Sequence, residues 1–398
     1  MSLINQPIAL ASPEAALSEP FLVEVLQSLV RTRSVNPGIY EVEMAELVSQ
    51  WLAPTGAQVH IVEMAPGRPS VAAVIEGSGD GPRLVLNGHM DTVPIDDADL
   101  WDGDPFGGDV RDGYLYGRGA CDMKAGLTTQ IAVAHHLAGR AESMRGTLIL
   151  QFAAGEECAE PGTLSMLQQG FAGDFGIVTE PTQLKVAVAE RGLAHYRVRI
   201  NGRSIHASRA HLGVNPVAKL RRVLEVLETY HQEAQAKPHP LLPGGSCTPT
   251  VVHAGVKENA VADRCELLLD RRLLPGETID GELQELRRRL GDVQAKDPGF
   301  DCDVTRFELG FEPAEIPVDS PFAQSVADAM REVTGARGEI WGTPFSSDVR
   351  NLVNDAGMEA ITFGPGNVAE CHCANERVSL LELRQGAEVI ARVARDLL

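Results

Sequence analysis

Residues 82–124 read PRLVLNGHMDTVPIDDADLWDGDPFGGDVRDGYLYGRGACDMK, and this stretch decides the fold. An apolar run, Leu84–Leu86, leads into Asn87-Gly88 and then His89, and a Gly-rich loop leads on to Asp122. We interpret the run as a buried strand that delivers His89 at its end. His89 and Asp122 are therefore candidate metal ligands, and Asp91 is the candidate acceptor for the second ring N–H of His89, which fixes the tautomer.

Bulk properties limit the class of protein. A chain of 398 residues predicts more than one domain. A net charge of −20 argues against nucleic-acid and anionic-membrane partners, and no apolar run approaches the roughly 18–20 residues of a membrane helix. The N-terminus lacks the pattern of a secretory signal, and the seven cysteines show no CxxC pairing. We therefore expect a cytoplasmic protein with reduced thiols.

The two ends of the chain alternate between short apolar runs and amphipathic segments. Strands are expected at 59–64, 71–75, 84–89, 147–153, 176–179 and 359–363, and helices within 20–53 and at 124–137, 162–169, 322–334 and 380–397. This alternation predicts the α/β class, with a mainly parallel sheet and helices on both faces. We assign residues 1–181 and 312–398 to this discontinuous, metal-binding catalytic domain.

The pattern changes between residues 182 and 311. Residues 186–200 alternate as a strand does, followed by a helix at 216–232, strands at 249–256 and 265–274, a helix at 281–290 and a strand at 302–309. Strand-helix-strand-strand-helix-strand is the order of a small α+β sandwich. We therefore interpret 182–311 as an inserted domain.

Polar side chains follow the expected strands of the first domain. In open α/β sheets, ligands collect beyond the carboxyl ends of the strands, and the candidate ligands are His89, Asp122, Glu157, Glu180 and His372. This set suits two divalent first-row metals, with zinc the best match and cobalt or manganese as alternatives. Asp122 would bridge, with His89 and Glu180 on one metal and Glu157 and His372 on the other. The remaining carboxylate, Glu156, is the candidate general base that moves a proton from water to the leaving amine.

Five segments carry a resemblance to a known family: NGHMDTVP, GRGACDMKAG, AAGEEC, TEP and FGPGNVAECH. They resemble the metal-site motifs of the M20 metallopeptidases and deacylases, in particular the acetylornithine deacetylase and succinyl-diaminopimelate desuccinylase branch. The resemblance spans nearly the whole chain in the family's order. It implies the ligand assignments above, a cis peptide after Asp122, and a homodimer formed through the inserted domain.

The resemblance also assigns roles within the inserted domain and beside it. The segment Gly202–Ala207 resembles the family's lid histidine segment, which implies that His206 stabilises the oxyanion in the partner subunit's active site. Arg191, Asn259 and Arg272 match positions around the substrate carboxylate, and Ser346 is a candidate for the same pocket. The family often has Asn-Val-Ile-Pro where this chain has Asn259-Ala260-Val261-Ala262.

The expected function is metal-dependent removal of an N-acyl group from a small amino acid, with acetylornithine deacetylation as the first choice. Desuccinylation of succinyl-diaminopimelate, or carboxypeptidase G2-like or dipeptidase cleavage, is the alternative within the same chemistry. A metal-binding scaffold without catalysis is the alternative from another class, and the presence of all five ligands and the base argues against it.

Overall fold

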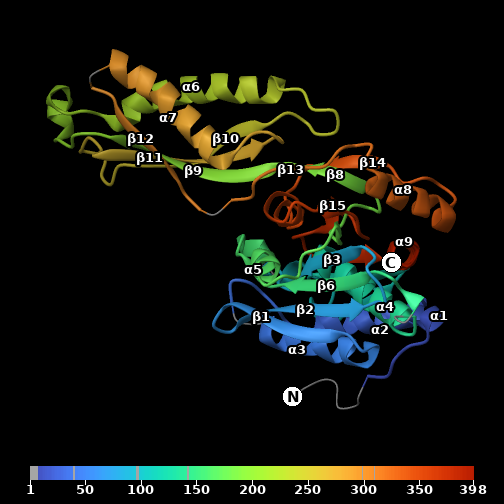
Figure 1. Cartoon of the computed structure of the whole chain (residues 1–398). Helices are drawn as coiled ribbons and strands as arrows, with labels where there is room; N and C mark the ends of the chain where they lie inside the picture. Colours follow the sequence, from blue (N-terminus) through green and yellow to red (C-terminus); the bar gives the residue numbers. More distant parts are fainter. Residues whose placement is uncertain (1–7, 39–40, 96–97, 141–142, 298, 309) are drawn as a thin grey trace. The chain divides into compact units, whose positions relative to one another are not determined.

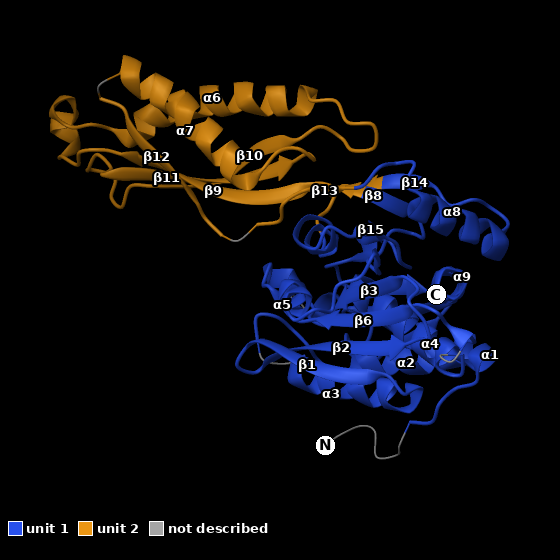
Figure 2. Ribbon diagram, viewed as in Figure 1, with its two compact units in different colours: residues 1–188, 316–341, 347–398 blue, residues 189–315, 342–346 orange. Residues whose placement is uncertain are grey.

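The chain forms two compact units, coloured separately in Figure 2. The computed structural model describes all residues except 1–7, 39–40, 96–97, 141–142, 298 and 309. Unit 1 contains residues 1–188, 316–341 and 347–398, and unit 2 contains 189–315 and 342–346. The first boundary lies after the expected residue 181 because β8, Val186–Glu190, places Ala187 opposite Thr362 of the large sheet.

Unit 1 is built on a large mixed sheet with the strand order β1-β2-β6-β3-β7-β15-β8 (Figure 1). The neighbours β6, β3, β7 and β15 run parallel, whereas β1, β2 and β8 join antiparallel. The strands are β1 Gln58–Ala65, β2 Arg68–Glu76, β3 Arg83–His89, β6 Thr147–Ala153, β7 Phe175–Val178 and β15 Glu359–Thr362, and β8 also pairs with β13 Ala314–Glu315 and β14 Ile340–Thr343. The mainly parallel centre confirms the predicted α/β class.

Helices pack on both faces of this sheet. Gly88 faces α4. A side chain at this position would collide with Leu127 of α4 and with Met123, which precedes the helix, so glycine permits the close approach of strand and helix. The next residue along the strand points to the other face, and there Ala153, the partner of His89, packs with Met166 of α5. The helices are α1 Pro13–Ala16, α2 Glu19–Arg31, α3 Glu41–Leu52, α4 Ala125–Ala138, α5 Gly162–Gln168, α8 Pro321–Thr334 and α9 Leu380–Leu397.

A small antiparallel sheet, not expected from the sequence, lies within unit 1. It has the order β16-β5-β4, with β4 Asp109–Arg111, β5 Tyr114–Tyr116 and β16 Arg377–Ser379. Strands of three residues are too short to show a period of two, so the segment between residues 92 and 121 reads as loop. The sheet brings the residues that follow His372 beside those that precede Asp122.

Unit 2 is the α+β sandwich that the sequence predicts. Its antiparallel sheet has the order β10-β11-β9-β12, and two helices pack on it through a core that includes Tyr196, Leu227 and Leu286. The elements are β9 Gly192–Asn201, α6 Pro216–Ala236, β10 Ser246–Ala254, β11 Arg264–Leu273, α7 Ile279–Lys296 and β12 Asp301–Arg306. The run expected as one strand over 186–200 is broken at Arg191 into β8 and β9. Across the described parts of both units, no helix has the length and apolarity needed to cross a membrane.

Candidate metal centre

Three parallel strands deliver the first ligands to one edge of the large sheet. His89 is the last residue of β3 and lies opposite Ala153, the last residue of β6. Glu156 and Glu157 follow β6 after Gly155, whose φ of 84° is in the left-handed region that glycine adopts easily. Glu180 follows β7 by two residues. The carboxyl ends of parallel strands meet at one edge, which is why residues far apart in sequence come together.

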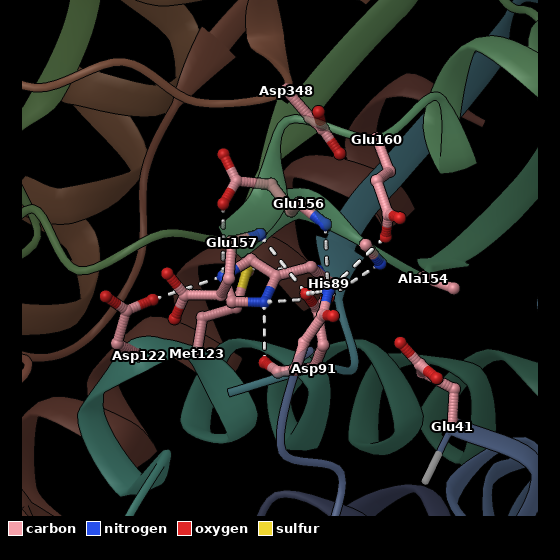
Figure 3. Close-up of polar contacts among 12 residues, drawn as sticks. Glu41, His89, Asp91, Asp122, Met123, Ala154, Glu156, Glu157, Glu160 and Asp348 are labelled. Atoms are coloured by element: carbon pink, nitrogen blue, oxygen red, sulfur yellow. Dashed lines mark hydrogen bonds and ion pairs between the residues drawn. The ribbon is translucent and has the colours of Figure 1, made fainter. Parts of the chain in front are cut away.

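Asp122 lies between the two histidines. Its Oδ1 is 3.1 Å from His89 Nε2, and its Oδ2 is 3.2 Å from His372 Nε2. Each histidine also contacts a second carboxylate. His89 Nε2 is 3.4 Å from Glu180 Oε1, and His372 Nε2 is 3.3 Å from Glu157. Figure 3 shows His89, Asp122 and Glu157 turned toward one another. These contacts place Asp122 between the pair His89 and Glu180 and the pair His372 and Glu157.

The donor set fits a pair of divalent cations on geometry and on charge. Ligand atoms about 2.0–2.1 Å from a tetrahedral ion lie about 3.3 Å from one another, and the four contacts span 3.1–3.4 Å. The four acidic residues, Asp122, Glu156, Glu157 and Glu180, carry a charge of −4 when ionised, which two divalent cations balance. Buried carboxylates without such partners would be costly.

Glu156 stands slightly apart from the ligand pairs. Its Oε2 is 4.0 Å from His89 Nε2, farther than the oxygens of Asp122 and Glu180. Although it groups with His89 and Glu180 as a possible three-ligand set, this longer distance favours a free carboxylate beside the metals. Asp348 was not among the residues predicted from the sequence. Beyond the effect of burial, its carboxylate raises the pKa of Glu156, and it accepts a hydrogen bond of 2.6 Å from Thr163 Oγ1.

Asp91 contacts the ring of His89 through its backbone oxygen and not through its carboxylate. The second ring nitrogen of His89, Nδ1, lies 2.9 Å from the backbone oxygen of Asp91, whereas the carboxylate oxygen is 3.6 Å away. The expected carboxylate acceptor is therefore corrected to a carbonyl acceptor, which fixes the same tautomer. The Asp91 carboxylate instead accepts the backbone N–H groups of Gly155, Glu156 and Glu157 at 2.9–3.2 Å. It positions the turn that carries the candidate base.

The cysteines beside His372 do not join the ligand groups among the described residues. His372 has a φ of 60°, so the chain at Cys371–Cys373 is turned and not extended. Cys371 Sγ instead lies 3.6 Å from Cys121 Sγ, and Cys373 donates to the backbone oxygen of Glu370. The peptide bond between Asp122 and Met123 is cis, as the resemblance implied.

Without metal, the acidic residues compete for protons. Burial, together with the charge of Asp122, raises the pKa of Glu180 to about 7. Burial also raises the pKa of Glu156 well above its ordinary value, and the carboxylates of Asp348 and Glu180 add to this shift. Hydrogen bonds to Asp122 and Glu157 raise the pKa of His372 to about 11. The site therefore attracts positive charge, whether protons or cations.

The metal-free protein is expected to lose stability as the pH rises from about 5 to about 7. The folded chain keeps the Glu180 proton up to a pKa of about 7, whereas the unfolded chain releases it near 4.5, so the folded state binds more protons in this window. The loss from this group alone is on the order of 3 kcal/mol. Melting temperatures of metal-free and metal-loaded protein across this pH range test the expectation. A metal-free protein that gains stability toward neutral pH would contradict it.

The substrate-binding candidates form two clusters in unit 2. The backbone oxygen of Arg191 accepts a hydrogen bond of 2.6 Å from Ser346 Oγ. Burial lowers the pKa of Arg191, and the neighbouring charge of Arg272 lowers it further. The exposed His206 lies beside the other exposed candidate, Asn259, because Ala207 N donates to Asn259 O at 2.9 Å. The structure thus brings Arg191, Arg272 and Ser346 together, and separately His206 and Asn259.

The fold and the ligand constellation define a metal-dependent hydrolase of the parallel-sheet type with an inserted sandwich. The model of peptidase family M20/M25/M40 matches residues 85–396, and the chain belongs to this family.

Named relatives cover nearly the whole chain at low identity. Succinyl-diaminopimelate desuccinylase of Parvibaculum lavamentivorans is 29% identical and covers 97% of this chain and 98% of its own length. Acetylornithine deacetylase of Vibrio atlanticus is 28% identical, with coverage of 94% and 98%. N-formyl-4-amino-5-aminomethyl-2-methylpyrimidine deformylase of Halalkalibacterium halodurans is 26% identical, with coverage of 92% and 91%. These three names differ in the acyl group removed, so they leave the substrate unresolved.

Solved structures share the fold. Aminopeptidase PepT of Bacillus cereus superposes with a TM-score of 0.78 at 18% identity, covering 96% of this chain and 99% of that one. A dinuclear metal-binding peptidase of the M20 family from Bacillus subtilis gives a TM-score of 0.71 at 18% identity, covering 95% and 98%. At such identities the likeness concerns architecture alone.

Proposed function

We propose that the protein is a cytoplasmic, dinuclear zinc amidohydrolase that removes an acyl group from a small N-acyl amino acid, as an acetylornithine deacetylase does. One observation carries the proposal: the two oxygens of Asp122 face two separate histidines, each paired with a further carboxylate. The dinuclear metal content described for the Bacillus subtilis relative and the deacylase names of the sequence relatives support it.

The chemistry needs a metal pair and a proton carrier. Bound divalent cations lower the pKa of a coordinated water and polarise the scissile carbonyl. Glu156 accepts the proton that water loses as its oxygen attacks the carbonyl carbon. Glu156 then donates this proton to the leaving nitrogen when the carbon–nitrogen bond breaks. The products are a carboxylic acid and an amine, and transfer of the acid's remaining proton gives a carboxylate and an ammonium. Burial and neighbouring carboxylates raise the pKa of Glu156, which suits the donating step.

Activity on a substrate panel tests the proposal. Purified protein loaded with zinc, cobalt or manganese is assayed on N-acetylornithine, N-succinyl-diaminopimelate, an N-formyl amine and several dipeptides, under identical conditions. Highest kcat/KM on N-acetylornithine supports the first choice, and a preference for the succinyl substrate or a dipeptide supports the alternatives. No turnover on any amide with both metals bound would favour the non-catalytic scaffold.

The distribution of candidates within unit 2 supports a dimer. Arg191 adjoins the start of β9, whereas the segment that carries His206 follows the end of β9 and pairs with Ala260. Ten residues of strand separate the two ends by roughly 30 Å, so the two clusters of one chain are too far apart to share one small substrate. We infer that the partner subunit's His206 completes each active site.

His206→Ala is expected to lower kcat by about 10²-fold, with a smaller change in KM, because one oxyanion donor is lost. Steady-state kinetics measure the effect. His211→Ala, an exposed histidine of the same loop, is the matched control and should retain wild-type kinetics. A His206→Ala enzyme with wild-type kcat would exclude the oxyanion role.

Mixing two inactive variants tests whether His206 acts across subunits. In a hybrid of His206→Ala and Glu156→Gln subunits, one active site combines an intact Glu156 with the partner's intact His206. Random reassortment should therefore restore about a quarter of wild-type activity. Mixtures that stay inactive, despite proven subunit exchange, would place His206 in the active site of its own chain or outside catalysis.

A further inference from the structure

The carboxylate of Glu376 accepts several hydrogen bonds from the loop that carries Asp122. Its side chain is fully buried. One carboxylate oxygen accepts the N–H groups of Cys121 and Asp122 at 2.9 and 3.0 Å. The other accepts the N–H of Gly119 at 3.0 Å and the guanidinium of Arg118 at 2.6 Å. Every one of these contacts comes from residues 118–122, so the carboxylate acts as an anchor for that loop.

The backbone of the same residue strengthens this anchor. Gly117 N donates to Glu376 O at 2.9 Å, and the pairing of β16 with β5 begins at the next residue, with Arg377 opposite Tyr116. His372 lies only four residues earlier in the chain. Glu376 therefore connects the segment that carries His372 to the loop that carries Asp122.

Backbone acceptors hold only part of the loop. Arg118 N donates to Pro105 O at 2.7 Å and Ala120 N to Gly117 O at 3.0 Å, which leaves Gly119, Cys121 and Asp122 to the Glu376 carboxylate. Gly117 and Gly119 have φ values of 153° and 80°, and the backbone around Asp122 departs from helical geometry. Its N–H groups lack strand partners, and buried N–H groups need an acceptor. A carboxylate offers enough lone pairs to accept all of them at once, whereas a neutral amide offers only one oxygen.

We propose that Glu376 is a positioning residue that holds the carboxylate of Asp122 between His89 and His372 and so sets the affinity of the metal pair. The inference rests on the metal centre proposed above. Partners that orient metal ligands typically change metal affinity by about 10- to 100-fold when they are removed. Glu376 makes no hydrogen bond to the side chains of the candidate ligands. It acts through the backbone N–H groups of Gly119, Cys121 and Asp122 and through the guanidinium of Arg118.

Glu376→Gln tests the proposal with little change in size. The glutamine oxygen replaces one acceptor, but its NH₂ group faces donors, so part of the anchor is lost. We expect zinc affinity, measured by competition with a chromogenic chelator, to fall about 10- to 100-fold. The visible absorption spectrum of the cobalt-loaded variant should also shift, because Asp122 changes its orientation. A change in thermal stability alone would not alter that spectrum.

Glu370→Gln is the matched control. Glu370 lies on the same segment and pairs with the partly exposed Arg377, whereas the hydrogen bonds to residues 118–122 come from Glu376. It should keep wild-type zinc affinity and the wild-type cobalt spectrum. A folded Glu376→Gln protein with both properties unchanged would overturn the proposal. Because neither readout requires turnover, an inactive result on the substrate panel would leave this test intact.

Hydrogen exchange of the wild-type protein gives a second test that needs no variant. In the metal-free protein, the amides of Gly119, Cys121 and Asp122 should exchange slowly, since Glu376 already holds them. The amide of Gly113, at the exposed turn between β4 and β5, provides an internal reference. If the three loop amides exchange as fast as this reference until metal is added, metal binding orders the loop and the proposal is wrong. This result decides the question even if Glu376→Gln does not fold.

Discussion

Replacing Glu156 with glutamine is expected to lower kcat by about 10³-fold while both metals stay bound. The glutamine side chain keeps the size of glutamate but accepts no proton from water and has none to pass to the leaving amine. In the wild type, Glu156 Oε2 lies 4.0 Å from His89 Nε2, farther than the proposed ligands. The metals are therefore expected to stay bound in the variant. Steady-state kinetics and metal analysis on the same preparation measure the two consequences together.

Metal content separates the two possible roles of Glu156. If Glu156→Gln loses one metal as well as activity, Glu156 is a ligand, as its grouping with His89 and Glu180 also allows, and the assignment as free base is wrong. Glu160→Gln is the matched control. Glu160 lies four residues away and pairs with Arg68 instead of the metal ligands, so it should keep kcat and metal content.

The parallel centre of the sheet could be predicted from the sequence because it depends on local patterns of apolar and polar residues. Short apolar runs with Glu or His a few residues further on indicate buried strands that end at a site. The structure places His89 at the end of β3, and Glu156 and Glu180 beyond β6 and β7. The order of the inserted sandwich was predictable for the same reason, since β9 and β11 alternate clearly.

The contacts that hold the ligands in place were not predictable. Glu376 is one acidic residue in a polar segment, and no local pattern marks it as buried. Its role depends on the pairing of β5 with β16, which lie far apart in the chain and have only three residues each. The acceptor for His89 was misassigned because the pattern His-x-Asp does not tell the carbonyl oxygen of the aspartate from its side chain.

Asp122→Ala is expected to abolish measurable activity, with a loss of at least about 10⁴-fold in kcat/KM, and to remove both metals. The two oxygens of Asp122 contact both histidines, at 3.1 and 3.2 Å. In the proposed dinuclear centre, each metal would lose a ligand, and the positive charge of the pair would lose the carboxylate that Asp122 supplies to both sites. Metal analysis after dialysis should find less than one equivalent, compared with about two for the wild type.

In the metal-free protein, the same substitution is expected to weaken the pH dependence of stability. Removing one carboxylate relieves repulsion, because Asp122 is a cause of the raised pKa of both Glu157 and Glu180. Metal-free Asp122→Ala should therefore lose less stability between pH 5 and pH 7 than the metal-free wild type. Asp80→Ala, whose side chain is 97% exposed, is the control and should match the wild type in both forms. If Asp122→Ala kept two metals, the bridge would lie elsewhere. If it kept one, Asp122 would be a terminal ligand of the metal that was lost.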